Sequence, residues 1–375
     1  ATEATAAKID LALSKVAALN GFTEATNKTS IDVSVAGVYA IKAEETGFTY
    51  KTATAYVGFG EPYPALTGAE VTAKKSPTSV DKTVADKDHV VAIGDIVTYT
   101  IEAYVPFIDA ANTGKRTFTI TDEITGADYY LTGPNSVNSV TMEGKEGQVG
   151  TIVVNEAGTG FTIDLNNLVA DTANPNAGKK ITVTYTAKVK EVTVENNAGS
   201  HAAGVDYGGE NVPVKLFTGD LVLLKYGDGD LNNVLANAEF VLYKDGEEAP
   251  LTFTKQRDGK YKYAPDAEDA SATLVTDENG MIYVEGLDVG SYHFEETKAP
   301  KGYSINTDGK TLTLTVEGEV ATAKLYNEGS LNDTKLNALP STGGMGTYLF
   351  TIIGVVVMAG AAGAFFISRR KGSEE

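Results

Sequence analysis

Apolar and polar residues alternate with a period of two over most of residues 80–330. The alternation is clearest over residues 97–105, 181–187 and 312–316. Because successive side chains of a β-strand point to opposite faces, this pattern predicts half-buried antiparallel strands. Asn-Gly and Asp-Gly pairs at residues 279–280 and 308–309 are typical of hairpin turns between such strands. We therefore expect an all-β chain made of tandem immunoglobulin-like sandwiches.

The alternating region divides into two predicted sandwiches at a break near residues 207–219. We expect a middle domain over residues 71–212 and a second sandwich over residues 213–332. Residues 1–70 hold few strand-like segments and are predicted to form an incomplete N-terminal domain. Residues 333–375 begin with a short polar linker, continue through an apolar run and end in a basic tail.

Composition excludes several classes of function. The chain of 375 residues has no cysteine, so it has no disulfide, thiolate nucleophile or cysteine-based metal site. Its net charge of −19 disfavours a nucleic-acid partner. No phosphate loop or catalytic carboxylate pair is apparent, and its three histidines are scattered, so we expect no turnover enzyme, no cofactor and no metal ion.

The C-terminal end combines a short motif, an apolar run and a basic cluster in a fixed order. The motif is Leu339-Pro340-Ser341-Thr342-Gly343, and residues 347–367 form the apolar run. A helix of that length crosses a hydrocarbon layer of ~30 Å. Residues 369–371 are Arg-Arg-Lys and would hold the C-terminus in the cytoplasm, so we expect a transmembrane helix with the rest of the chain outside. The chain opens without Met or an apolar leader, so we expect a removed secretory signal or a partial sequence.

The C-terminal motif resembles the LPxTG substrate of sortase enzymes of Gram-positive bacteria. The resemblance implies that a sortase thiolate attacks the carbonyl of Thr342 and releases the chain from Gly343 onward. Leu339, Pro340 and Ser341 complete the recognised sequence. The implied localisation is a secreted, cell-wall-anchored surface protein attached to peptidoglycan. Its membrane insertion is transient and precedes sorting.

Reactive side chains occupy the apolar faces of several predicted strands. One set is Lys82, Asp122 and Asn196 in the middle domain, and the other is Lys225, Glu296 and Asn327 in the last domain. Burial of a lone charge costs roughly several kcal/mol. A domain therefore keeps charged side chains in its core only where they contact one another. The repeated order of lysine, acid and asparagine predicts that each set converges.

Convergence in a dry core predicts covalent chemistry. Burial lowers the pKa of a lysine and raises the pKa of a carboxyl group, so a neutral amine can attack the asparagine amide while the acid carries protons. Ammonia leaves, and an intramolecular Lys-Asn isopeptide bond remains. Asp122 and Glu296 are the predicted promoting acids. A hydrogen-bonded triad without a covalent bond is the alternative. Asn197 could replace Asn196, although strand parity favours Asn196 unless a bulge intervenes.

Two further segments carry a resemblance to Gram-positive pilins. Residues 292–303 (YHFEETKAPKGY) resemble the pilin E-box, and residues 235–240 (LANAEF) resemble the second strand of collagen-adhesin B-type (CnaB) domains. The resemblance implies Cna-type sandwiches and a Lys225–Asn327 bond with Glu296 as catalyst. Residues 80–84 and 94–99 are similar to the opening of a pilin middle domain, which implies a Lys82–Asn196 bond assisted by Asp122.

In that family a lysine ahead of the middle domain joins one subunit to the next. The corresponding segment here is residues 71–77, where Lys74 is the preferred nucleophile and Lys75 the alternative; two solvated linker lysines are the third interpretation. The resemblance implies a major (backbone or shaft) pilin. Its expected partners are pilus-type and housekeeping sortases, identical subunits in a head-to-tail polymer, and ancillary pilins. The competing hypothesis is a wall-anchored adhesin or an ancillary or tip pilin.

Overall fold

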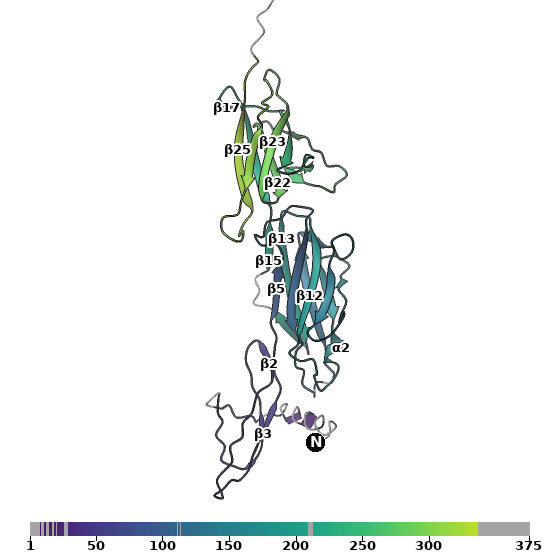
Figure 1. Cartoon of the computed structure of the whole chain (residues 1–375), viewed down its shortest axis with the longest axis vertical. Coiled ribbons are helices and arrows are strands. Elements are labelled where there is room, and N and C mark those ends of the chain that lie inside the picture. The colour runs from purple at the N-terminus through teal and green to yellow at the C-terminus, as the bar shows by residue number, and fades with distance from the viewer. Residues whose placement is uncertain are drawn as a thin grey trace, which may run out of the picture.

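The computed structural model describes residues 29–110, 112, 114–208 and 213–336, together with residues 8, 11, 12, 15, 16, 19 and 21–25. The regular structure of these residues is nearly all β, which confirms the predicted fold class. A short helix, α2 (Asn166–Val169), interrupts the middle domain. Figure 1 shows an elongated molecule in which the N-terminal strands, the middle sandwich and the last sandwich follow one another along the long axis.

The middle sandwich contains a five-stranded and a six-stranded sheet. The first sheet consists of β5 (Val80–Val84), β6 (Ile96–Tyr104), β12 (Lys180–Val189), β8 (Ala127–Tyr129) and β9 (Asn138–Met142). The second consists of β10 (Val153–Val154), β11 (Gly160–Asp164), β7 (Phe118–Thr125), β13 (Thr193–Ala202), β14 (Val205–Gly208) and β15 (Val214–Phe217). The long strands β6 and β12 are antiparallel neighbours, and β13 pairs with β7.

The alternation seen in the sequence is the reason that these sheets face one another. Along β6, Val97, Tyr99 and Ile101 are buried and the residues between them are only partly covered. Tyr185 on β12 belongs to the same core and is fully buried. One face of each strand therefore buries apolar side chains, which stabilises the fold by about 25 cal/mol per Å² of apolar surface removed from water. The other face remains polar.

The last sandwich has a second pair of sheets. Its six-stranded sheet consists of β17 (Asp230–Val234), β16 (Gly219–Gly227), β22 (Met281–Leu287), β20 (Tyr261–Tyr263), β19 (Phe253–Lys255) and β25 (Leu325–Asp333). The four-stranded sheet consists of β21 (Leu274–Val275), β18 (Glu239–Lys244), β23 (Gly290–Lys298) and β24 (Lys310–Leu314). The final strand, β25, pairs with the first strand, β16, in parallel.

The N-terminal segment contributes two small antiparallel pairs. β1 (Gly37–Ile41) pairs with β3 (Ala53–Val57), and β2 (Phe48–Tyr50) pairs with β4 (Lys75–Pro77). The pairing of β4 with β2 extends past residue 70, where the sequence placed the first boundary. In the same way, β15 pairs with β13, so the sheet of the middle domain continues to Phe217.

Direct contacts join the middle and last sandwiches. The backbone N–H of Ile93 donates to the carbonyl of Gly286 at 3.0 Å. Lys262 forms an ion pair with Glu191 at 2.6 Å. A second ion pair joins Lys188 to Asp266 at 2.8 Å. Together with the short link between β15 and β16, these contacts hold the two sandwiches end to end (Figure 1).

The described residues contain no helix of the length and apolarity that a membrane crossing requires. The predicted transmembrane segment and the motif at residues 339–343 lie outside the described part of the chain.

Candidate isopeptide sites

Three neighbouring strands bring the middle triad together. Lys82 lies on β5 of the five-stranded sheet, whereas Asp122 on β7 and Asn196 on β13 belong to the six-stranded sheet. Asn196 pairs with Ile124 and is therefore two positions along β7 from Asp122, on the same face. The lysine thus reaches across the sandwich to an acid and an amide that share one face.

The reactive atoms of the middle triad are in contact. The Nζ of Lys82 donates to the Oδ1 of Asn196 at 2.5 Å and forms an ion pair with the Oδ2 of Asp122. The side chains of Lys82 and Asp122 are 2% and 0% exposed. Asn196 is fully buried as well. Nucleophile, acid and amide therefore meet in an interior shielded from water, although 114 residues separate Lys82 from Asn196.

Burial changes the protonation of this triad. Loss of hydration lowers the pKa of Lys82 to about 8, and the charge of Asp122 opposes only part of that change. Burial raises the pKa of Asp122, and the nearby Lys82 opposes that shift. Both shifts favour the neutral amine and the neutral carboxyl group. A neutral amine is the form that can attack an amide.

Asn197, the alternative partner, lies on the other face of β13. It is exposed, and its contact with Lys82 is through its backbone carbonyl, 3.4 Å from Nζ. The pairing of β13 with β7 runs without a register shift through Asn196 and Asn197. The structure therefore places the amide of Asn196, and not that of Asn197, beside the amine.

Two tyrosines that the sequence analysis did not single out complete the middle site. Tyr129 and Tyr185 donate hydrogen bonds to the Oδ1 of Asp122 at 2.8 and 2.9 Å. The hydroxyl of Tyr185 also accepts hydrogen bonds from Lys82 and Asn196. Tyr185 belongs to the alternating pattern of β12, but the pattern indicates only a core position and gives no sign of these contacts.

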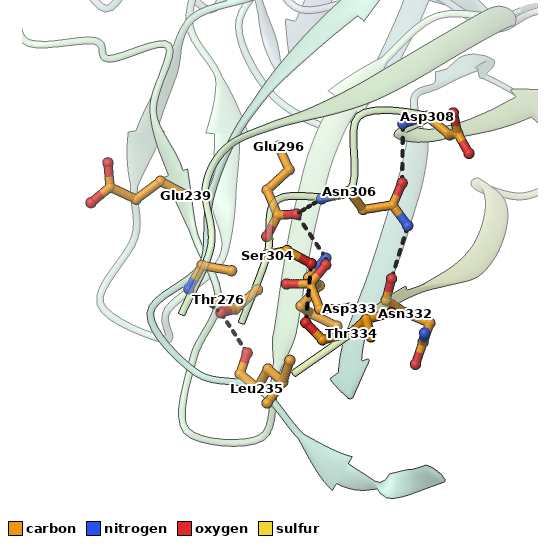
Figure 2. Close-up of polar contacts among 12 residues, drawn as sticks. Leu235, Glu239, Thr276, Glu296, Ser304, Asn306, Asp308, Asn332, Asp333 and Thr334 are labelled. Carbon is orange, nitrogen blue, oxygen red and sulfur yellow. Dashed lines mark hydrogen bonds and ion pairs between the residues drawn. The ribbon is translucent and has the colours of Figure 1, made fainter. Parts of the chain in front are cut away.

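The last sandwich buries a second lysine beside two acids. Lys225 on β16 lies 3.0 Å from the Oε2 of Glu296 on β23, and it also pairs with Asp333 on β25. All three side chains are completely shielded from solvent. Figure 2 shows Glu296 and Asp333 close together in this interior. The predicted pair of Lys225 and Glu296 is therefore in contact, and the third member is an aspartate.

The prediction that Asn327 is the partner of Lys225 is wrong. In the parallel pairing of β16 with β25, Asn327 lies opposite Leu221, four residues before Lys225. At ~3.3 Å per residue this separates the two positions by roughly 13 Å along the strand. The side chain of Asn327 instead donates to the carbonyl of Thr313 at 2.6 Å. Asn327 therefore lies away from the amine of Lys225.

Strand register explains the position of Asp333. Lys225 lies opposite Leu331, and Asp333 is two residues beyond Leu331 on the same face. Asn327 and Asp333 have the same parity, so alternation in the sequence could not distinguish them. The signal that could have found Asp333 is its own position: it is an acid in phase with the apolar residues of the final strand.

Backbone and side-chain contacts orient Glu296. Its Oε2 accepts a hydrogen bond from the backbone N–H of Asn306 at 2.8 Å. The side chain of Asn306 is held in turn by the carbonyl of Asn332, also at 2.8 Å (Figure 2). The Oε1 of Glu296 and the Oδ2 of Asp333 are buried and have no hydrogen-bond partner among the residues that the structure describes. Burial raises the pKa of Asp333 to about 6, and the contact with Lys225 opposes that shift.

The two candidate intersubunit lysines differ in their surroundings. Lys75 on β4 forms an ion pair with Glu45 at 3.2 Å and lies over the ring of Phe48. The hydrogen bond to Glu45 raises the pKa of Lys75 and so favours its charged form. Lys74 is exposed, and the described residues show no ion pair of its side chain. Both lysines are exposed, and they differ in that the amine of Lys75 is held by Glu45.

Comparisons with known families place two segments of the chain. Residues 219–329 match SpaA, a prealbumin-like fold domain, and residues 332–374 match the LPXTG cell wall anchor motif. The first match covers the last sandwich, and the second covers the predicted sorting segment. The anchor motif supports a secreted, cell-wall-anchored surface protein.

Curated relatives are surface and fimbrial proteins. The chain is 25% identical to the fimbrial subunit type 1 of Actinomyces viscosus over 356 residues, which is 80% of this chain and 65% of that protein. It is 38% identical over 110 residues to the trypsin-resistant surface T6 protein of Streptococcus pyogenes serotype M6, which is 28% of this chain and 19% of that protein. The chain thus spans less than two thirds of the length of either relative.

Solved pilin structures share the fold. The T6 backbone pilin of S. pyogenes serotype M6 has a TM-score of 0.53 at 15% identity, with 81% of this chain and 82% of that chain covered. The full-length major pilin SpaD of Corynebacterium diphtheriae has a TM-score of 0.50 at 21% identity, with 81% and 77% covered. The chain therefore shares its fold with solved pilins, its C-terminal motif with wall-anchored proteins and part of its sequence with fimbrial proteins.

Proposed function

We propose that this chain is the structural major subunit of a sortase-assembled covalent pilus, stabilised by autocatalytic intramolecular isopeptide bonds. The contact of Lys82 with Asp122 and Asn196 in a buried interior is the observation that carries this proposal. A buried lysine, acid and amide are costly to keep in a core, and a covalent bond removes the charges that make them costly. The chain acts as a sortase substrate and performs only a single-turnover reaction on itself.

In the middle domain the proposed bond joins the Nζ of Lys82 to the Cγ of Asn196. A proton moves from the ammonium group to Asp122, and the free amine attacks the amide carbon. The bond from Cγ to Nδ2 breaks, and the nitrogen leaves as ammonia. The sandwich holds amine and amide in contact, which supplies the effective concentration that an unactivated amide needs.

In the last domain we propose Asp333 as the partner of Lys225, in place of Asn327. The ammonium nitrogen loses two protons and Asp333 loses one carboxylate oxygen, and these leave together as water. Glu296 contacts the amine and is the acid that carries protons between the two groups. The condensation removes the charges of Lys225 and Asp333 and leaves only Glu296 able to ionise. Because buried charges are costly, this loss of charge favours the reaction.

Polymerisation would join Thr342 of one subunit to Lys74 of the next. In this proposal a pilus-type sortase holds one subunit as an acyl-enzyme at Thr342, and the amine of Lys74 on the next subunit resolves it into an intersubunit isopeptide bond. A housekeeping sortase then transfers the fibre to peptidoglycan. Head-to-tail joining of identical subunits gives an open fibre, to which ancillary pilins can be added.

Immunoblots of wall extracts test the shaft assignment. We expect SDS-resistant multimers in a ladder, and we expect Lys74→Ala to reduce the ladder to the monomer while Lys75→Ala retains it. Lys75→Ala is the matched control because it removes a neighbouring lysine that is already paired with Glu45. A single band from the unmodified chain would favour a wall-anchored adhesin or tip pilin. A ladder from the double variant would exclude both lysines as the nucleophile.

A further inference from the structure

The hydroxyl of Tyr185 lies at the centre of the middle site. It accepts hydrogen bonds from the Nζ of Lys82 at 2.7 Å and from the Nδ2 of Asn196 at 2.9 Å. It donates to the Oδ1 of Asp122 at 2.9 Å. One phenol oxygen is therefore in contact with the attacking nitrogen, the nitrogen that leaves and the acid that promotes the reaction.

Packing holds this phenol in place. Tyr185 is fully buried on β12, and its ring stacks on Tyr99 with a centroid distance of 5.6 Å. The ring of Phe161 packs nearly perpendicular to it, with a centroid distance of 5.0 Å. A side chain held by two rings in this way keeps its hydroxyl in one position, which is a requirement for a group that transfers a proton.

The reaction needs a proton at the Nδ2 of Asn196, which Asp122 does not contact through a hydrogen bond among the described residues. An amide nitrogen leaves as ammonia only after it has been protonated. Asp122 pairs with Lys82, but among the described residues no hydrogen bond joins Asp122 to the Nδ2 of Asn196. The phenol of Tyr185 bridges the two groups. The path from acid to leaving nitrogen is therefore two hydrogen bonds through one oxygen.

We propose that Tyr185 is a catalytic residue of the middle domain, which relays a proton from Asp122 to the departing nitrogen of Asn196. This inference rests on the proposed Lys82–Asn196 bond. After Nζ has bonded to Cγ, the carboxyl proton of Asp122 moves to the phenol oxygen, and the phenol proton moves to Nδ2. Asp122 then accepts the second proton that Nζ gives up. The Cγ–Nδ2 bond breaks, neutral ammonia leaves, and Asp122 ends as a neutral acid beside the new amide.

The electrostatic surroundings suit such a relay. Burial, and the nearby charge of Asp122, raise the pKa of Tyr185 well above its usual value. The phenol therefore keeps its proton and can release one only as it receives another. The last sandwich offers a contrast, because Lys225 contacts Glu296 and Asp333 directly there and water is the proposed leaving group. A relay serves the middle domain because, among the described residues, the leaving nitrogen is hydrogen-bonded to Tyr185 and not to the acid.

Replacement of Tyr185 by Phe tests the relay. The full chain is synthesised in a cell-free system, synthesis is stopped, and samples are quenched with acid over time for mass spectrometry of the peptides that contain Lys82 and Asn196. We expect Tyr185→Phe to slow loss of ammonia by about a hundredfold, the lower range for general acid-base catalysis. Tyr207→Phe is the matched control, because Tyr207 packs against the same core and, among the described residues, makes no hydrogen bond to Lys82, Asp122 or Asn196. It should react near the rate of the unmodified chain.

A second variant separates catalysis from packing. A ring-fluorinated tyrosine at position 185 keeps the hydroxyl and nearly the same shape but acidifies the phenol. A changed rate of ammonia loss in this variant supports the relay. An unchanged rate in both the fluorinated and the Phe variants overturns the relay. In that case, ammonia loss from the unmodified chain would still support the Lys82–Asn196 bond. Absence of ammonia loss from the unmodified chain overturns both the bond and the relay.

Discussion

Burial controls the chemistry of single residues in both sandwiches. Lys82, Asp122, Lys225 and Glu296 were predicted to lie inside, and each has a partner in the core. In the middle domain the amide completes the set, whereas in the last domain a carboxylate does. In the proposed reactions the third group would determine which molecule leaves, ammonia in the middle domain and water in the last domain. The two domains would therefore show different losses of mass.

The last domain should lose water and not ammonia. High-resolution intact mass of the soluble chain should show loss of one ammonia and one water, because Asp333 is a carboxylate. Asp333→Ala should abolish the loss of water, since it removes the carboxyl group that we propose as the partner of Lys225, and Glu296 acts only as the proton carrier. Asn327→Ala should retain it, because Asn327 is bonded to Thr313. Loss of two ammonia molecules from the unmodified chain, one of which Asn327→Ala abolishes, would instead support a bond between Lys225 and Asn327.

A variant without the Lys82–Asn196 bond should show the lowered pKa of the buried Lys82 through the pH dependence of its stability. In Asn196→Ala the pKa of Lys82 should remain near 8 in the folded chain against 10.5 in the unfolded chain. The unfolded state then binds more protons between these values, so the free energy of unfolding rises with pH over that window, by up to about 3 kcal/mol. Denaturant titrations at several pH values measure it. Lys82→Met in the same background should lose this slope, and an equal slope there would contradict the assignment.

At the scale of elements, the two proposed bonds connect different parts of a sandwich. Lys82 on β5 and Asn196 on β13 belong to opposite sheets, so their bond would join the two layers. Lys225 on β16 and Asp333 on β25 belong to neighbouring parallel strands of one sheet. The first bond would resist separation of the layers, and the second would resist removal of the final strand from the edge of the sheet.

Stability should fall sharply when the bond between the layers is removed. The Lys82–Asn196 bond would close a loop across 114 positions of the chain. By analogy with a disulfide, such a loop restricts the unfolded chain by about 4 to 5 kcal/mol. We expect Asn196→Ala to lower the free energy of unfolding of the middle domain by at least this amount in denaturant titrations. Asn197→Ala, at the exposed neighbour, should change it by less than about 0.5 kcal/mol; similar losses in both variants would argue against the bond.

At the scale of the whole molecule, the order of the domains determines how tension passes. Figure 1 shows the two sandwiches end to end, with β15 at the junction. A load that enters near Lys74 reaches the proposed bond at Lys82 almost at once and leaves it at Asn196. β14 and β15 follow Asn196 and lie outside the closed loop, but β15 is paired with β13. The bonds would therefore shield most of each sandwich from extension.

Single-molecule stretching should detect this shielding. Pulled between residue 74 and residue 336, the unmodified chain should not release the loop that lies between residues 82 and 196. Asn196→Ala should add one unfolding step of roughly 400 Å, given 114 positions at ~3.4 Å each. Asn197→Ala should add none. A step of that length in the unmodified chain would show that the middle domain carries no cross-link.

The sequence by itself determined the strand period, the inward lysines and acids, and the sorting motif, because these depend on local alternation or on contiguous residues. Alternation fixes the face on which a side chain lies, so Asn196 and Asn197 could be separated by parity alone. Only the tertiary structure decided that Asp333, and not Asn327, meets Lys225, because both share one face and the register of β25 against β16 selects between them. The place of Tyr185 was decided in the same way, since four strands from two sheets must pack before one hydroxyl can contact all three reacting groups.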